Sequence, residues 1–134
     1  MKTKRVVIFI VLLLIFSSSQ CSNVIDTIGH HVKATMYHPV KSQCSGNPLM
    51  TADGSKINLN SLRSGKIRWI AVSRDLLKHY SFGDTVYVYA DNEKLSGLWV
   101  IHDTMGPRHK MTIDSLMHPK STHIIPKKVK IKPV

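Results

Sequence analysis

The stretch at residues 98–114, LWVIHDTMGPRHKMTID, carries the clearest indications of fold and chemistry in this chain. An apolar run leads into Asp103, a Gly106-Pro107 turn with basic neighbours follows, and a second apolar segment leads into Asp114. Short apolar runs separated by Gly and Pro are typical of β-strands joined by a turn. The chain has only 8 acidic residues against 19 basic ones, and paired carboxylates are the usual groups for breaking a glycosidic bond.

Outward from this stretch the pattern is almost entirely β. Alternating and β-branched segments predict about six strands, at residues 32–37, 68–72, 85–89, 95–102, 111–114 and 129–131. Residues 73–78 predict one helical turn capped by Ser73, and the polar residues 41–59 predict a long loop. Lysines alternating with Val and Ile at 127–132 predict a half-exposed edge strand. Many short strands indicate an all-β fold, either a small barrel or a sandwich.

The first 20 residues predict an export signal. Three cations precede the apolar run Val6–Phe16, and a short Ser-rich stretch follows it, as in secretory signal peptides. The run is shorter than the roughly 20 apolar residues that span a bilayer. We therefore expect an exported periplasmic or cell-envelope protein, with residues 21–31 as a tether and residues 32–134 as one domain.

Cys21, directly after this signal, has three open fates. It could be the lipidated cysteine of a bacterial lipoprotein, which would tether the protein to a membrane. Ordinary cleavage of the signal would leave it unmodified. A disulfide with Cys44, the only other cysteine, is the third alternative, because disulfides persist outside the cytoplasm.

The charge of the chain indicates an anionic partner. Its net charge is +11, and it stays strongly basic without the three cations of the signal. For an exported protein this favours an anionic envelope polysaccharide or lipid surface over nucleic acid. A solvated basic surface that only aids solubility is the alternative. We expect a monomer.

Five segments, in their order along the chain, resemble the six-stranded double-psi β-barrel. They are ATMY at 34–37, TADG at 51–54, IAVS at 70–73, FGDTV at 82–86, and the D…GP…ID pattern at 103–114. The relatives are the rare lipoprotein A domain, the bacterial 3D (three-aspartate) domain, the barrel of membrane-bound lytic transglycosylase A, and the plant expansins. The resemblance covers roughly residues 32–131 and implies a small all-β double-psi β-barrel. Where the 3D family has a Gly-rich turn, this chain has Met105 and Pro107–His109.

The resemblance implies that Asp114 is a catalytic general acid and base and that Asp103 is its catalytic helper. The apolar neighbours of Asp114 favour a raised pKa, which a proton donor near neutral pH requires. In the transglycosylases the same aspartate then acts as base while the sugar's 6-hydroxyl closes an anhydro ring. Two structural alternatives stay open: Asp103 satisfies backbone amides of its turn, and Asp114 caps the turn after it.

Five further residues are expected at the substrate site: Thr35, Tyr37, Asp53, His102 and Thr104. Thr35 and Tyr37 match the segment that lines the polysaccharide groove of expansin-like proteins. Asp53 stands in the TADG turn, at a position where the relatives vary. His102, beside Asp103, is expected either to hydrogen-bond nearby or to bind substrate.

Other side chains are expected to have structural roles. Trp69 and Trp99 lie within β-patterns and are predicted to pack in the core. The eight histidines form no pair spaced to share a metal on one helix, so we expect no metal and no cofactor. A nucleophilic pair of Cys44 with a histidine is disfavoured because a polar loop would not hold the thiol firmly.

The expected function is cleavage of peptidoglycan glycan strands by an exported, lytic transglycosylase-like enzyme. The main alternative is a non-catalytic, expansin-like module that binds polysaccharide or loosens the cell wall. A third reading is a structural or inhibitory barrel whose ligand is another protein.

Overall fold

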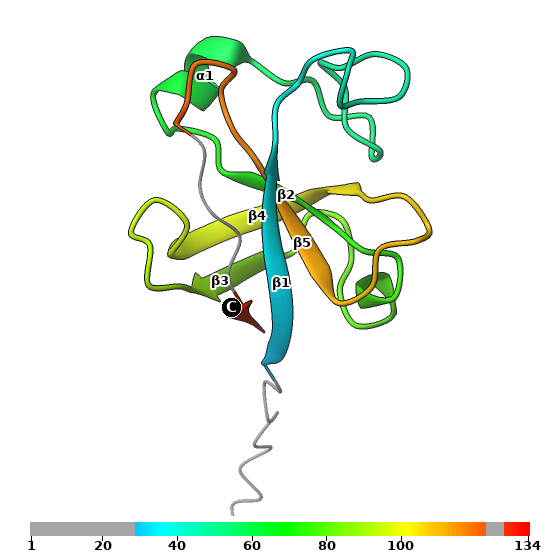
Figure 1. The fold of residues 1–134 in the computed structure, drawn as a ribbon, viewed down its shortest axis with the longest axis vertical. Helices are drawn as coiled ribbons and strands as arrows, with labels where there is room; N and C mark the ends of the chain where they lie inside the picture. Colours follow the sequence, from blue (N-terminus) through cyan, green and yellow to red (C-terminus); the bar gives the residue numbers. More distant parts are fainter. Residues whose placement is uncertain (1–28, 123–127) are drawn as a thin grey trace, which may run out of the picture.

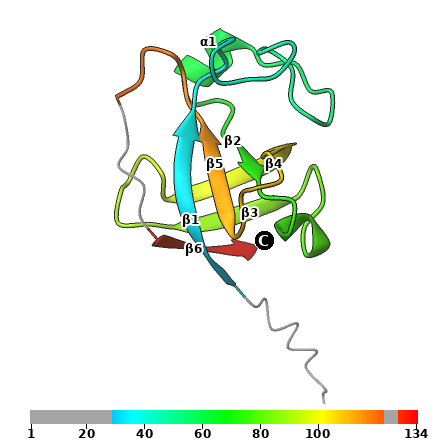
Figure 2. The same ribbon diagram turned by 45° about the vertical axis from the view of Figure 1, so that its right-hand side comes forward.

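The computed structural model describes residues 29–122 and 128–134. Its six strands close into a barrel in the order β1-β5-β2-β4-β3-β6 (Figures 1 and 2). The strands are β1 (His30–Tyr37), β2 (Trp69–Val72), β3 (Thr85–Tyr89), β4 (Gly97–Thr104), β5 (Thr112–Leu116) and β6 (Lys128–Pro133). The β1–β5 and β2–β4 pairs are parallel, and the other pairs are antiparallel. The predicted all-β barrel is confirmed, and its first strand begins at His30, inside the expected tether.

The prediction of an edge strand near the C-terminus is wrong. β6 pairs with β1 on one side and with β3 on the other, so it closes the barrel (Figure 2). Its side chains alternate as predicted for a strand, because Val129 and Ile131 are buried while Lys128, Lys130 and Lys132 point outward. An outward lysine pattern is the same for an edge strand and for a strand in a barrel wall, so sequence alone could not separate them.

Two short helices lie in the connections. Helix α1 (Leu59–Arg63) was not predicted; the side chain of Asn58 caps it by accepting a hydrogen bond from the Ser61 amide. The helical turn expected after β2 is the 3₁₀ helix η1 (Leu76–Lys78). Ser73 does not cap it with its side chain. Its hydroxyl instead accepts a hydrogen bond from the amide of Thr112 on β5.

The barrel wall separates two hydrophobic clusters. On β2, Ile70 and Val72 point into the barrel and join the larger cluster, together with Trp99 as predicted. Ala71, between them, points to the outer face. There it joins a second cluster with residues from β1, from β5, from the long connection after β1 and from the segment after β4: Tyr37, Ile57, Leu62, Met105 and Leu116. The segment from 38 to 67, including α1, therefore covers one end of the barrel's outer face (Figure 1).

The predicted core role of Trp69 holds only in part, because this side chain is half-buried against the second cluster. In the part of the chain that the structure describes, no helix is long and apolar enough to cross a membrane. The expected export signal and the alternatives for Cys21 lie outside the described residues.

Candidate functional site

A β-bulge turns Asp103 onto the outer face of the barrel. On the β2–β4 ladder Ile70 pairs with Ile101, but the next residue, Ala71, pairs with Asp103, so His102 is the extra residue. In a regular strand Asp103 would share the inward face of Ile101, because side chains alternate. The bulge instead places it on the face of Ala71, outside the hydrophobic interior.

Asp103 and Asp114 belong to one row of side chains across the wall. Ala71 pairs with Asp103 on β4 and with Asp114 on β5, and Asp114 in turn pairs with Thr35 on β1. Directly paired residues project to the same face of a sheet. Two strand spacings put the backbones of the two aspartates roughly 10 Å apart. The methyl group of Ala71 leaves the space between the carboxylates open.

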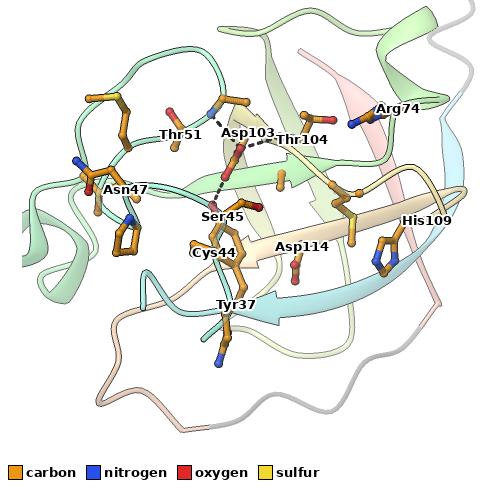
Figure 3. Close-up of a pocket in the computed structure, with 18 residues that line it drawn as sticks. Tyr37, Cys44, Ser45, Asn47, Thr51, Arg74, Asp103, Thr104, His109 and Asp114 are labelled. Carbon is orange, nitrogen blue, oxygen red and sulfur yellow. Dashed lines mark hydrogen bonds between the residues drawn. The ribbon is translucent and has the colours of Figure 1, made fainter. Parts of the chain in front are cut away.

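A pocket of about 560 Å³ lies along this row (Figure 3). Its floor is the barrel wall with Ala71 and the two aspartates. The connection after β1 forms one side, through Gln43, Cys44, Ser45, Asn47, Pro48, Met50, Thr51, Ala52 and Ile57. The other side comes from the last residue of β4 and from the segments after β2 and β4, through Arg74, Thr104, Met105, Gly106 and His109. Figure 3 shows Asp114 between Tyr37 and His109, at the centre of the pocket.

Three hydrogen bonds hold the carboxylate of Asp103. Oδ2 accepts from the Tyr37 hydroxyl at 2.9 Å, and Oδ1 accepts from the amides of Ala52 at 3.0 Å and Thr104 at 2.9 Å. Burial, and then the charge of Asp103, raise the pKa of Tyr37, so the phenol remains a donor. Asp103 thus satisfies backbone amides, as expected from the structural alternative to a catalytic role. Through the Ala52 amide it also links the barrel wall to the connection after β1.

Asp114 lies in a drier environment. Its Oδ1 accepts a hydrogen bond from the Thr35 hydroxyl at 2.7 Å. Burial raises the pKa of Asp114, and the charge of Asp103 adds to this, while the Thr35 hydroxyl and the nearby His109 partly offset it. The capping alternative for Asp114 does not hold, because this residue sits inside β5 with paired neighbours on both sides.

Asp53 and His102 form a hydrogen-bonded pair beside the pocket without lining it. His102 Nδ1 lies 2.6 Å from Asp53 Oδ2 and 3.2 Å from the Ser55 hydroxyl, and its ring packs on Trp69 at 4.4 Å. Burial alone would raise the pKa of Asp53, but hydrogen bonds from Thr51, His102 and Ser55 lower it to about 2. The pair therefore fastens the turn at residues 51–55 to the bulge of β4.

The other predicted site residues take different positions. Tyr37 and Thr104 line the pocket, and Thr35 reaches it through its bond to Asp114. The hydroxyl of Thr104 donates to the Val72 carbonyl at 3.0 Å, so it is engaged by the wall itself. Cys21 lies outside the described residues.

Two basic residues that line the pocket, Arg74 and His109, were not among the site residues predicted from the sequence. Arg74 is exposed and makes no hydrogen bond or ion pair with any residue that the structure describes. His109 follows the Gly-Pro turn, and its charge lowers the pKa of Asp114. Arg74 follows β2 and His109 precedes β5, and the two come together only because these strands pair in the fold. No local sequence motif could therefore predict that they share a pocket.

Cys44 also lines the pocket, where its thiol donates to the His38 carbonyl at 3.4 Å. Burial raises its pKa, which favours the thiol over the nucleophilic thiolate. Across residues 29–122 and 128–134, no three side chains of His, Cys, Asp or Glu gather as a metal site.

In comparisons with known proteins, no protein-family profile, no curated protein and no solved structure matches this chain. The function of the pocket is therefore inferred from its geometry and its charges.

Proposed function

We propose that this protein is an exported, lytic transglycosylase-like enzyme that cleaves peptidoglycan glycan strands, with Asp114 as general acid and base. One observation carries the proposal: two carboxylates face one pocket from unlike environments. Asp114 is buried with a raised pKa, whereas Asp103 is held by the Tyr37 hydroxyl and two amides. An acid and a charged helper in separate environments are what glycosidic cleavage by two carboxyl groups requires.

We also propose that the barrel is of the double-psi type. The closed six-stranded order and its two parallel strand pairs, β1–β5 and β2–β4, support this assignment. The segments quoted for the resemblance fall at matching places: ATMY lies on β1, and the D…GP…ID pattern joins β4 to β5. Rare lipoprotein A, 3D and transglycosylase A barrels are thus the proposed relatives.

The proposed reaction moves one proton through Asp114. Its protonated carboxyl donates to the glycosidic oxygen, the bond from that oxygen to the anomeric carbon breaks, and positive charge develops on the sugar. The Asp103 carboxylate, across Ala71, stabilises this charge. Asp114 then accepts the proton of the sugar's 6-hydroxyl, whose oxygen bonds to the anomeric carbon and closes the anhydro ring. The enzyme returns to its starting protonation state, and the reaction needs no cofactor.

The basic side of the pocket favours an anionic glycan. Arg74 and His109 line the side formed by the segments after β2 and β4, and Arg74 has no partner among the described residues. An unpaired guanidinium is suited to bind a carboxylate in a bidentate manner. Peptidoglycan offers such groups on its muramic acid residues and stem peptides.

Digestion of purified cell walls tests the catalytic proposal. The full chain should release anhydro-sugar products detectable by mass spectrometry. Asp114→Asn should lower their rate of formation at least about 100-fold, the usual contribution of a general acid, with an unchanged circular dichroism spectrum. Asp91→Asn, in the turn after β3, is the matched control and should keep full activity. Wild-type protein that binds walls but releases no anhydro sugar over long incubation would refute catalysis.

A non-catalytic, expansin-like role is the second candidate, and the site contains one observation in its favour. Both the Thr35 hydroxyl and His109 lower the pKa of Asp114, which favours the charged form that cannot donate a proton. In that case the row of Thr35, Asp114 and Asp103 only binds the sugar hydroxyls. Binding to insoluble wall that survives Asp114→Asn, without any product, would support this role.

A further inference from the structure

The outer face of β3 and β6 combines lysines with exposed tyrosines. On β6, Lys130 and Lys132 project outward, and they pair directly with Tyr89 and Tyr87 of β3. We call this surface the lysine–tyrosine face and define it by Lys128, Lys130, Lys132, Tyr87, Tyr89 and Leu98. Because directly paired residues share one face, these side chains form a continuous patch.

Apolar and aromatic groups on this face are unusually open to solvent. Tyr89 is 49% exposed and Leu98 is 51% exposed, and the rings of Tyr87 and Tyr89 lie 4.5 Å apart. Leu98 pairs with Tyr87 across the β3–β4 ladder. Aromatic rings with a polar tip beside exposed leucine suit a boundary between water and an apolar phase.

The charge of the face and its border is positive. His31 and Lys33 of β1 pair with Lys130 and Lys128, so the basic surface continues onto the neighbouring strand. None of the positions that define the face is acidic; the nearest acidic residues along the chain, Asp84 and Asp91, lie just before and just after β3. No lysine of the face forms an ion pair with a residue that the structure describes.

The chain enters the barrel next to these lysines. A methyl group on Gly29 would collide with the side chains of Lys130 and Lys132. The apolar run Val6–Phe16 and Cys21 precede this point in the sequence. Residues 17–28 reach at most about 40 Å when fully extended. A bilayer that holds a lipid on Cys21 would therefore lie within reach of this face.

We infer that the lysine–tyrosine face docks the barrel onto a bilayer of anionic phospholipid. The lysines attract the anionic headgroups, and the tyrosines and Leu98 enter the interfacial layer. The strand order puts β3 and β6 across the barrel from β5 and β2. Docking by this face would therefore turn the pocket of Asp103 and Asp114 away from the bilayer, toward any polymer above it.

Oxidative footprinting on vesicles tests this inference. The full chain is placed on vesicles of phosphatidylcholine, with or without phosphatidylglycerol, and hydroxyl-radical oxidation is followed by mass spectrometry. With phosphatidylglycerol, Tyr87 and Tyr89 should be oxidised several-fold more slowly, and added salt should remove the protection. Met50, which is 42% exposed and lines the pocket, should be oxidised equally on both vesicles.

Two double variants distinguish binding through the lysine–tyrosine face from binding that depends only on the total charge of the protein. Lys130→Gln with Lys132→Gln should abolish the protection of Tyr89, whereas Lys56→Gln with Lys66→Gln, which removes the same number of positive charges elsewhere, should retain it. Equal oxidation of Tyr87 and Tyr89 on the two vesicles would overturn the inference. Protection by soluble anionic glycan fragments on phosphatidylcholine vesicles alone would also overturn it, because the face would then bind polymer. Neither result depends on catalysis at Asp114.

Discussion

Asp103 and Asp114 face one pocket from the two sides of Ala71, whose backbone pairs with both of them. The strands therefore fix the spacing of the carboxylates, and their side chains need no direct contact. The small side chain of Ala71 therefore determines how much space is open between the two carboxylates.

Enlarging the side chain between the aspartates should close the pocket. Ala71→Val would place two methyl groups in the space between the carboxylates, so we expect wall binding and any cleavage to fall at least tenfold, that is by about 1.4 kcal/mol or more. Ala71 is 4% exposed, so crowding should also cost roughly 1–3 kcal/mol of stability, measurable by urea unfolding. Ala71→Ser, which adds one small polar atom, should preserve binding. Full binding by folded Ala71→Val would show that the substrate does not pass between the aspartates.

Removing the charge of Asp114 should stabilise the protein at neutral pH. The folded-state pKa of Asp114 is raised above its ordinary value of 3.8, so the protein loses stability as the pH rises from 3.8 to the folded-state pKa, and the loss is complete above it. Asp114→Asn should therefore raise Tm at about pH 7, and the difference from wild type should disappear near about pH 3, where the carboxyl is protonated in both states. Thermal unfolding followed by circular dichroism across this range measures the effect.

Substitution of Asp53 should change the stability of the protein with the opposite dependence on pH, so Asp53→Asn serves as the comparison for Asp114→Asn. Its pKa is lowered to about 2, so it stabilises the fold above its ordinary value of 3.8 and loses that effect as the pH falls toward 2. Asp53→Asn should lower Tm at about pH 7, with the difference vanishing near about pH 2. Parallel pH profiles for the two variants would contradict the environments described for these carboxylates.

Two buried serines should respond differently to loss of the hydroxyl. Ser73 and Ser115 are each 0% exposed. The Ser73 hydroxyl accepts from the Thr112 amide, whereas the Ser115 hydroxyl has no partner among the described residues. Ser73→Ala should cost about 1–3 kcal/mol because it strands a buried amide, and Ser115→Ala should be neutral or stabilising by up to about 1 kcal/mol. Urea unfolding of both variants provides the measurement, and similar losses would contradict these assignments.

Gly97 should be the less replaceable of two glycines with positive φ. Its φ is +117°, and an added methyl group would lie 2.7 Å from the Arg68 guanidinium, which bonds to the carbonyls of Lys94 and Ser96. Gly83 has φ +90° with open space around it. Both Ala variants should lose roughly 1 kcal/mol to backbone strain. Gly97→Ala should lose clearly more, because Arg68 must move; equal losses in chemical denaturation would show that Arg68 adapts freely.

The strands could be predicted from the sequence because alternation along each one reflects its two faces. Closure of the barrel could not be predicted. Lys130 and Lys132 point outward on β6, and the same lysine pattern is expected for an edge strand and for a strand that pairs on both sides. Helix α1 is too short for a periodic signal, and its cap at Asn58 is the only local indication.

The two aspartates were identified from the sequence, but their shared face was not. That face depends on the bulge at His102, a difference of one residue in register that no composition or spacing reveals. The basic residues Arg74 and His109 were not predicted as site residues for a related reason. They follow different strands, and only the tertiary pairing of those strands brings them to the same pocket.

The contact between Asp53 and His102 joins the barrel wall to the connection between β1 and β2, which faces the wall across the pocket. The carboxylates stand on a ladder whose register cannot shift without loss of the barrel. The facing residues belong to a connection between β1 and β2 that the pair fastens at one turn. The two carboxylates and the side chains that face them from the connection after β1 therefore belong to separate stretches of the chain. Grafting a different connection onto the same barrel would change what enters the pocket while leaving the two aspartates in place.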